Sequence, residues 1–275
     1  MLENNMNVVI CIIARTTSTR LPLKVLRSFD STCSKSMLDM IIEKSKLSKL
    51  SSKVVLCTSN ERCDDILDDV AARHNISIYR GEAEEVISRM LNVANAEKAD
   101  YVVRITGDNA FVSAEYIDQQ ILFCKENNLD YCRLVGVPIG ATAELIKVTA
   151  LKDVFNKIDI SLSEYLMLYI FDPDSYRCGL LEFEGDFSDF GITIDTEDDL
   201  KNAREIVRLL GDKAEDLSLK NICNLLIGHE YLFSRIEPNA KVKMPLDKVI
   251  DYSEFKKDQQ SRIGRVSCIQ KNKLQ

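Results

Sequence analysis

Short apolar runs alternate with helical periods through the first half of this chain, and this alternation restricts the fold more than any other feature. The apolar runs predict buried strands, and the segments between them repeat apolar residues at helical spacing. Strands are expected at residues 8–14, 53–57, 76–79, 101–105 and 131–134, and helices at 36–50, 62–73, 86–94 and 114–127. Strands that are apolar throughout are buried on both faces, and helices usually connect parallel neighbours. We therefore predict a three-layer α/β fold, with helices on both faces of a mostly parallel sheet.

The rhythm loosens after residue 140. Helices are expected at 144–157, 162–171, 197–210 and 217–227, and short strands at 179–183 and 192–194. A polar tail with few aliphatic residues follows. We predict one main domain over residues 1–215 and a small helical or irregular extension over 216–275, which is the natural place for contacts between subunits.

The charge balance excludes whole classes of partner. Lys plus Arg number 36 and Asp plus Glu number 43, which gives a net charge of -7. Such a chain has no general affinity for nucleic acid or for an anionic membrane surface. The apolar run at 8–14 is too short to span a membrane, and no basic segment precedes it, so we expect a cytoplasmic protein. An anionic small molecule would need a local cluster of cations.

Nine cysteines and only two histidines are present, and no Cys-x-x-Cys occurs. This pattern favours reduced, buried thiols over a disulfide framework or a zinc site. Cys11 and Cys57 lie in apolar runs near the predicted sheet edge, but no Cys–His nucleophile pair is evident.

The segment at 15–24, which follows the first strand, carries three cations and four hydroxyl groups within ten residues. Guanidinium and ammonium groups in this density suit a polyphosphate ligand. The segment lacks the Gly-x-x-x-x-Gly-Lys pattern of a Walker loop, and a solvated basic loop is the plainer alternative.

Two aspartates follow predicted strands. Asp108 comes after the strand at 101–105, and Asp195 after the one at 192–194. Carboxylates at the ends of parallel strands can hold a hard cation in the cleft where the loops gather. The alternative is that they serve as turn or helix-capping residues, which the acidic run at 197–199 also suits.

Four motifs together resemble one family. Residues 15–24, Arg-Thr-Thr-Ser-Thr-Arg-Leu-Pro-Leu-Lys, are similar to the signature Arg-x-x-Ser-Thr-Arg-Leu-Pro-Gly-Lys of the CMP-sugar synthetases. The segments at 80–89, 103–108 and 193–200 resemble further motifs of its SpsF-like spore-coat polysaccharide branch, in the same order. The resemblance covers about residues 7–210.

This resemblance implies a Rossmann-like nucleotidyltransferase fold of the GT-A type. It also implies a Mg²⁺-dependent cytidylyltransferase that transfers CMP from CTP to an acidic sugar or related polyol, with release of pyrophosphate, and that forms a homodimer. The residues it singles out are Arg15, Ser18, Thr19, Arg20, Lys24, Arg89 and Thr106 for the nucleotide, Asp108 and Asp195 for magnesium, and Glu144 for the acceptor. Lys24, Arg15 and Asp108 would be the catalytic residues.

Two departures from the family pattern keep alternatives open. Leu23 stands where the family has glycine, and Gly191 lies where many relatives carry arginine. A non-catalytic nucleotide-binding relative is one alternative. A GT-A glycosyltransferase is another, although the only attractive Asp-x-Asp, at 172–174, follows a predicted helix rather than a strand.

Overall fold

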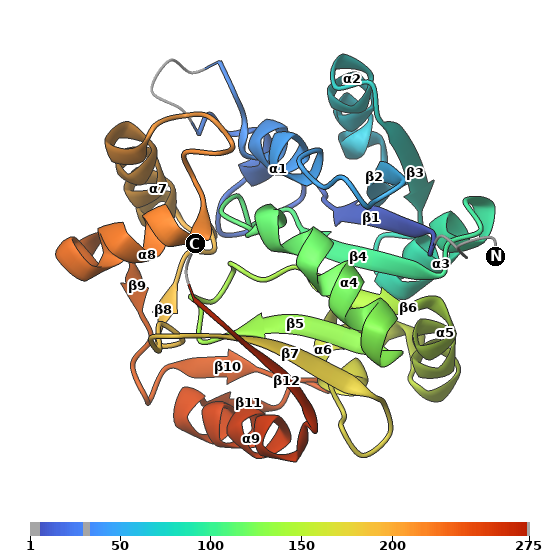
Figure 1. Cartoon of the computed structure of the whole chain (residues 1–275). Coiled ribbons are helices and arrows are strands. Elements are labelled where there is room, and N and C mark those ends of the chain that lie inside the picture. Colours follow the sequence, from blue (N-terminus) through green and yellow to red (C-terminus); the bar gives the residue numbers. More distant parts are fainter. Residues whose placement is uncertain (1–5, 30–33, 274–275) are drawn as a thin grey trace.

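A computed structural model describes residues 6–29 and 34–273 of the chain. Its centre is an eight-stranded sheet in the order β12-β7-β5-β6-β4-β1-β2-β3 (Figure 1). The strands are β1 Val8–Ile13, β2 Lys53–Ser59, β3 Ser77–Gly81, β4 Tyr101–Thr106, β5 Tyr131–Val135, β6 Glu144–Lys147, β7 Cys178–Phe183 and β12 Cys268–Asn272. Only β6 runs antiparallel to its neighbours β4 and β5, so the predicted mostly parallel sheet is confirmed.

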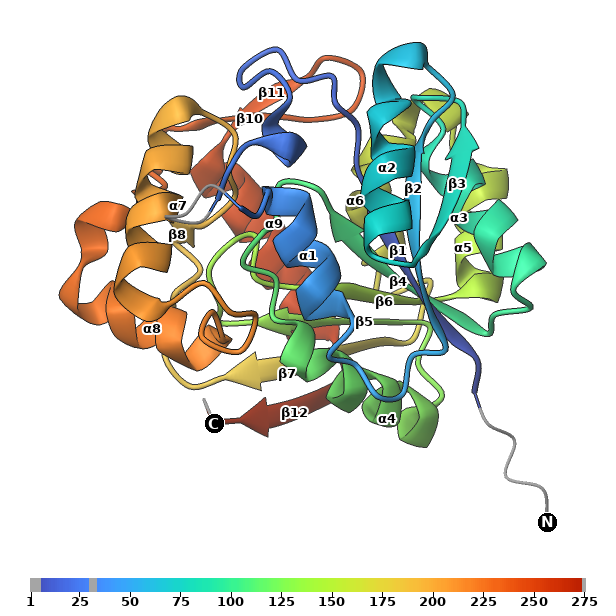
Figure 2. The same cartoon turned by 90° about the horizontal axis from the view of Figure 1, so that it is seen from above.

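Helices cover both faces of this sheet (Figures 1 and 2). The α-helices that the structure describes are α1 Met37–Ser45, α2 Ile66–Arg73, α3 Val86–Ala96, α4 Ile117–Asn127, α5 Val148–Lys157, α6 Leu166–Ile170, α7 Glu197–Leu210, α8 Leu219–Gly228 and α9 Tyr252–Arg265. Successive side chains of a strand point to opposite faces. Ile10 and Ile12 of β1 accordingly join the core beneath α1, α2, α4, α7 and α8. Val9 and Cys11 join the core beneath α3, α5, α6 and the end of α9.

Capping boxes define where two of the helices begin. Ser36 caps α1 through Asp39, and Thr196 caps α7 through Asp199. In each box the hydroxyl accepts from the third helical N–H, and the acidic side chain accepts from the capping residue's N–H. The predicted cap at the start of the 197–210 helix is therefore confirmed for Thr196.

Two predicted elements after residue 140 are wrong. The segment at 144–157 is not helical throughout, because Glu144–Lys147 forms β6 before α5 begins. Leu145 and Ile146 bury on opposite faces of the sheet, as strand residues do. The run at 192–194 is buried but forms no strand, because its backbone N–H groups donate to isolated loop carbonyls of Ile139 and Asp108.

Residues 216–273 join the main fold. Helix α9 leads into β12, which pairs in parallel with β7 and forms one edge of the central sheet. The sequence pattern does not predict this strand, because only Cys268 and Ile269 in it are apolar and none of its positions is fully buried. A two-stranded hairpin, β10 Lys241–Lys243 and β11 Val249–Asp251, precedes α9. Within the part of the chain that the structure describes, no helix has the length and apolar content needed to cross a bilayer.

Lys44 of α1 is fully buried, and its ammonium donates to the carbonyl of Leu217 at 2.5 Å. Burial lowers the pKa of Lys44 from 10.5 to about 8, and the nearby charge of Glu115 opposes this shift only in part. The unfolded chain therefore binds more protons than the folded one between about pH 8 and pH 10.5. Across that interval the free energy of unfolding should rise with pH.

The variant Lys44→Met isolates this contribution. We expect wild type to gain about 2–3 kcal/mol of unfolding free energy relative to the variant between pH 7 and pH 10, because one pKa unit corresponds to about 1.4 kcal/mol. Urea titrations of both proteins at each pH measure the difference. A difference that does not change with pH would contradict the lowered pKa.

Candidate functional site

The candidate site lies at the carboxyl ends of β1 and β4. Ile13 pairs with Cys57 on one side and with Thr106 on the other, so the loops after these strands start at one edge. Gly107 makes their close approach possible, because a Cβ at that position would meet both Ala14 and Val25 at 3.0 Å. The loop after β1 is thereby pressed against the loop that carries Asp108.

Lys24 stands between the two predicted metal ligands. Its Nζ lies 2.8 Å from a carboxylate oxygen of Asp195 and 3.4 Å from one of Asp108. Asp108 also accepts a hydrogen bond of 2.6 Å from the hydroxyl of Thr106, and the backbone N–H of Ile194 donates to the Asp108 carbonyl. The structure therefore brings Lys24, Asp108, Asp195 and Thr106 together from distant segments.

The other cations of the loop surround this cluster. Arg20 is largely exposed and reaches Asp195 at 3.1 Å, whereas Arg15 pairs with Glu84 at 2.8 Å. Sequence reasoning missed Arg27, which pairs with Glu197 at 2.9 Å in the first turn of α7. Arg15 and Arg20 keep enough exposure to exchange these carboxylates for phosphate oxygens.

The remaining predicted nucleotide residues lie in different surroundings. Ser18 accepts a hydrogen bond from the N–H of Leu21 and shapes the loop. Thr19 is exposed. Arg89 is buried on α3, where its guanidinium donates to the carbonyls of Cys57 and Ala83. Arg89 therefore supports the floor of the site from below and does not open to solvent.

The donor set at Asp108 and Asp195 fits a magnesium ion that is shared with a phosphate ligand. Both carboxylates face the same ammonium, so they already converge on one point. No third His, Cys, Asp or Glu completes a cluster among residues 6–29 and 34–273. Mg²⁺ is commonly bound through one or two carboxylates, with substrate phosphates and water supplying its other ligands.

Leu23 adopts the left-handed conformation, with φ 55° and ψ 27°. Glycine enters this region without steric cost, whereas other residues are strained there by roughly 1–2 kcal/mol. The first departure from the family signature thus lies where the backbone itself favours glycine. The leucine side chain is 51% exposed and fills no core position.

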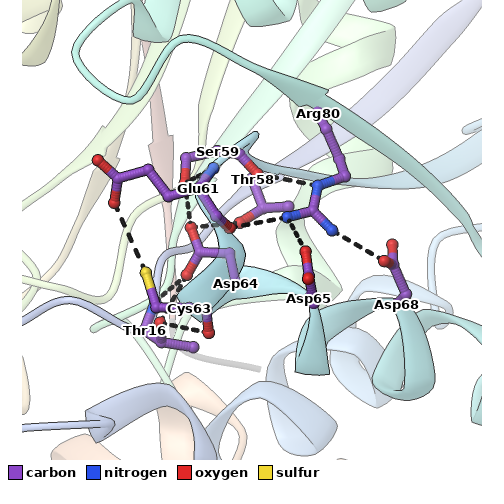
Figure 3. A network of polar contacts seen from close by, with 9 residues as sticks. All are labelled: Thr16, Thr58, Ser59, Glu61, Cys63, Asp64, Asp65, Asp68 and Arg80. Carbon is purple, nitrogen blue, oxygen red and sulfur yellow. Dashed lines mark hydrogen bonds and ion pairs between the residues drawn. The ribbon is translucent and has the colours of Figure 1, made fainter.

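A buried carboxylate, Asp64, anchors the start of the loop (Figure 3). It accepts hydrogen bonds of 2.7 Å from both the backbone N–H and the hydroxyl of Thr16, and further bonds from the hydroxyls of Thr58 and Ser59. Burial alone would raise the pKa of Asp64, but the donors from Ser59, Thr16 and Thr58 hold it below its usual value. The charged carboxylate thereby fixes the backbone next to Arg15.

The anchoring role of Asp64 was not predicted from the sequence. Its signal is weak: two adjacent aspartates follow the second strand, and only Asp64 turns inward. Its neighbour Asp65 stays exposed and pairs with Arg80, which also reaches Asp68 (Figure 3).

A cavity of about 700 Å³ adjoins the charged cluster and shares Thr106 with it. Glu144, predicted to contact an acceptor, lies in its lining. The Glu144 carboxylate accepts from Arg104 and, at 2.6 Å, from the hydroxyl of Tyr131. Both of its oxygens are thus engaged, and a contact to the acceptor stays a prediction.

The thiol groups of the described cysteines take no part in the charged cluster around Lys24. All eight that the structure describes are free, and Cys33 lies outside the described residues. Cys11 and Cys57 are fully buried against each other, and their contact together with burial raises the pKa of the Cys11 thiol well above its usual value. A thiol of this kind is a poor nucleophile.

Comparison with known proteins gives consistent results. A family model described as "Cytidylyltransferase" matches residues 9–223. The spore coat polysaccharide biosynthesis protein SpsF of Bacillus subtilis is 31% identical over 231 residues, which cover 80% of this chain and 95% of that protein. A 3-deoxy-manno-octulosonate cytidylyltransferase of Chloroherpeton thalassium is 31% identical over 134 residues, or 49% of this chain and 52% of the relative. A solved cytidylyltransferase structure from Leptospira borgpetersenii matches with a TM-score of 0.75 at 24% identity, over 82% of this chain and 96% of that one.

The anchor at Asp64 can be tested by Asp64→Ala. Its loss would leave the buried hydroxyls of Thr16, Thr58 and Ser59 without their acceptor, so we expect a loss of roughly 3 kcal/mol of unfolding free energy. Asp65→Ala is the matched control and should cost no more than about 1 kcal/mol, because it breaks only an exposed ion pair. Urea denaturation measures both variants, and equal losses would refute the anchoring role.

The strain at Leu23 gives a second prediction for this loop. Leu23→Val should lower the unfolding free energy by about 1 kcal/mol, because a β-branched side chain fits the left-handed region worst. Leu23→Gly should stay within about 1 kcal/mol of wild type, since the relief of strain is offset by backbone entropy. Thermal unfolding of the three proteins tests the order, and a valine variant as stable as the glycine variant would contradict it.

Proposed function

The chain belongs to the cytidylyltransferase family, as its sequence motifs predict, and we propose that it transfers CMP from CTP to a hydroxyl group of an acidic sugar or related polyol with release of pyrophosphate. Family membership supports a CTP-using enzyme of sugar-nucleotide biosynthesis. The acceptor, the magnesium ion and the released product belong to the proposal.

The position of Lys24 between Asp108 and Asp195 carries this proposal. The Lys24 ammonium is half-buried between two carboxylates, and it would be free to contact a phosphate once a bound magnesium ion took over those carboxylates. Arg15 and Arg20 extend the positive charge along the same loop. An acidic chain thus presents a local field that attracts a triphosphate.

Phosphoryl and nucleotidyl transfer depend mainly on positioning and on charge stabilisation. The acceptor oxygen forms a bond to the α-phosphorus as the bond between that phosphorus and the bridging oxygen of the leaving pyrophosphate breaks. Lys24, Arg15 and Arg20 would hold the phosphates and neutralise the charge that develops on the leaving group. The hydroxyl proton leaves to solvent or to a nearby carboxylate.

Magnesium, when bound by Asp108 and Asp195, would supply charge neutralisation and orient the phosphate oxygens. Thr106 supports Asp108 through its hydroxyl. A homodimer and a cytoplasmic location also stay predictions.

The geometry disfavours a GT-A glycosyltransferase. Asp172 and Asp174 lie in the turn between α6 and β7, at the amino end of β7, whereas ligands of such sheets bind at the carboxyl ends. Asp172 instead bonds to the hydroxyl of Ser175. A measurement of turnover distinguishes the proposed enzyme from a non-catalytic nucleotide-binding relative.

The decisive experiment mixes the protein with each of the four common nucleoside triphosphates, Mg²⁺ and a panel of sugar acids, and measures pyrophosphate release. We expect release with CTP and at least one acid. Release with none of them would refute the proposed activity, and binding of CTP without release would favour the non-catalytic relative. Release with UTP alone would refute CTP as the donor.

Substitutions then test the proposed catalytic roles of Lys24 and Asp108. Lys24→Met and Asp108→Ala should each lower kcat/KM by a factor of 100 or more, because each removes charge stabilisation from the transition state, on the order of 3 kcal/mol. Asp198→Ala is the control, since Asp198 is an exposed acid in the first turn of α7, three residues from Asp195. Full activity of Asp108→Ala would exclude its assigned role.

A further inference from the structure

Helix α9 forms one wall of the cavity beside the nucleotide site. The cavity of about 700 Å³ opens between the carboxyl ends of β4, β5 and β7 on one side and α9 on the other. Tyr252, Phe255 and Gln259 face it from α9. Figure 1 shows α9 beside β10 and β11, next to the half of the sheet that contains β7 and β12.

This wall lies outside the part of the chain that the family shares. The family model ends at residue 223, whereas α9 begins at Tyr252. Arg262 of α9 donates two hydrogen bonds, to the carbonyls of Leu168 and Phe171, and so attaches the helix to α6 and the residue after it. The chain's own C-terminal segment therefore completes a cavity that the shared domain leaves open.

A row of charged side chains crosses the sheet on the floor of this cavity. Arg104 of β4 and Glu144 of β6 are register partners and form an ion pair, and Arg133 of β5 comes next. Arg133 donates to Gln259 of α9 at 3.0 Å, and its guanidinium lies 4.2 Å from the ring centre of Phe171. Arg104 and Arg133 thus lie on either side of the Glu144 carboxylate, which already accepts hydrogen bonds from Arg104 and Tyr131.

Both arginines retain an unused donor. The Nε atoms of Arg104 and Arg133 are buried and have no hydrogen-bond partner among the described residues. Each Nε is enclosed by protein, but both side chains are only half-buried and line the cavity, so their guanidinium groups can meet a ligand there. A carboxylate offers the acceptor geometry that guanidinium groups match best.

The remaining walls match the other parts of a polyhydroxy acid. Glu182 and Asp186 lie in the lining as hydrogen-bond acceptors, which suits hydroxyl groups. Phe255 and Ile263 of α9 and Met167 of α6 supply an apolar surface for the C–H face of a sugar. Thr106 connects this cavity to Asp108, so a bound molecule would lie next to the proposed phosphate site.

We propose that α9 is the acceptor-recognition element of this enzyme: the cavity beneath it binds a polyhydroxy carboxylic acid, with the carboxylate at Arg104 and Arg133 and the hydrocarbon face against Phe255. This inference rests on the proposed function, and it identifies the residues that select the acceptor. It also assigns the acceptor site to a single copy of the chain.

Binding is tested on the full chain by saturation-transfer NMR and calorimetry, without turnover. The probes are 3-deoxy-manno-octulosonate, N-acetylneuraminate, glucuronate and gluconate, with glucose and glucitol as neutral counterparts of the last two. At least one acid should bind, and glucuronate or gluconate should bind at least ten times more tightly than its neutral counterpart. If no acid binds, or if the neutral compounds bind as well as their acids, the carboxylate assignment is overturned.

Variants separate the cavity from the nucleotide site. Phe255→Ala and Arg133→Met should each raise the acid's Kd at least tenfold and leave the Kd of CTP within twofold of wild type. Lys257→Ala, on the exposed side of α9, should change neither constant. Circular dichroism verifies folding, and Arg133→Met provides the test if Phe255→Ala does not fold.

The results distinguish this inference from the proposed function. If wild type turns over an acid and both cavity variants keep its KM, α9 does not select the acceptor although the enzyme function stands. If an acid binds and both variants weaken it, but no triphosphate gives pyrophosphate, the cavity assignment stands and the proposed reaction fails.

Discussion

The parallel pairing of β1 with β2 and β4 is the constraint on which the site depends. Its register places Ile13 beside both Cys57 and Thr106, and so directs three loops to one edge of the sheet. Backbone hydrogen bonds hold this arrangement, and the close contact at Gly107 brings the first and third of these loops together. Lys24 meets Asp108 only because these strands end level with each other.

The sequence was informative wherever one local rule decided the structure. Continuous apolar runs placed strands β1 to β5, and the position of Asp108 after the fourth strand predicted that it would lie in the cleft. Asp195 also reaches the site, although the strand expected before it is absent. There the chain is held by single hydrogen bonds to Ile139 and to Asp108, which no periodic pattern records.

Features that depend on tertiary contacts could not be predicted in this way. Asp64 and Asp65 are identical neighbours in the sequence, and only the packing of Thr16 against β2 makes one an anchor and the other a surface residue. The polar tail has no apolar pattern that would predict α9, which buries only Tyr252 and Gln259, or β12, which buries none of its residues. The segment that begins at Glu144 was expected to be helical. It forms strand β6 instead, because its successive side chains are buried on opposite faces of the sheet.

Strand β12 pairs Cys268 with Gly179 of β7, far earlier in the chain, and this has a consequence for biosynthesis. The residues of the proposed nucleotide site end at Asp195, so they can assemble while the ribosome is still adding the remainder. The acceptor wall and the β12 edge cannot form until residues 252–272 have been added, because pairing over such a separation closes a long loop. A prematurely terminated product would thus keep the charge cluster but expose the edge of β7, where unpaired backbone groups invite aggregation.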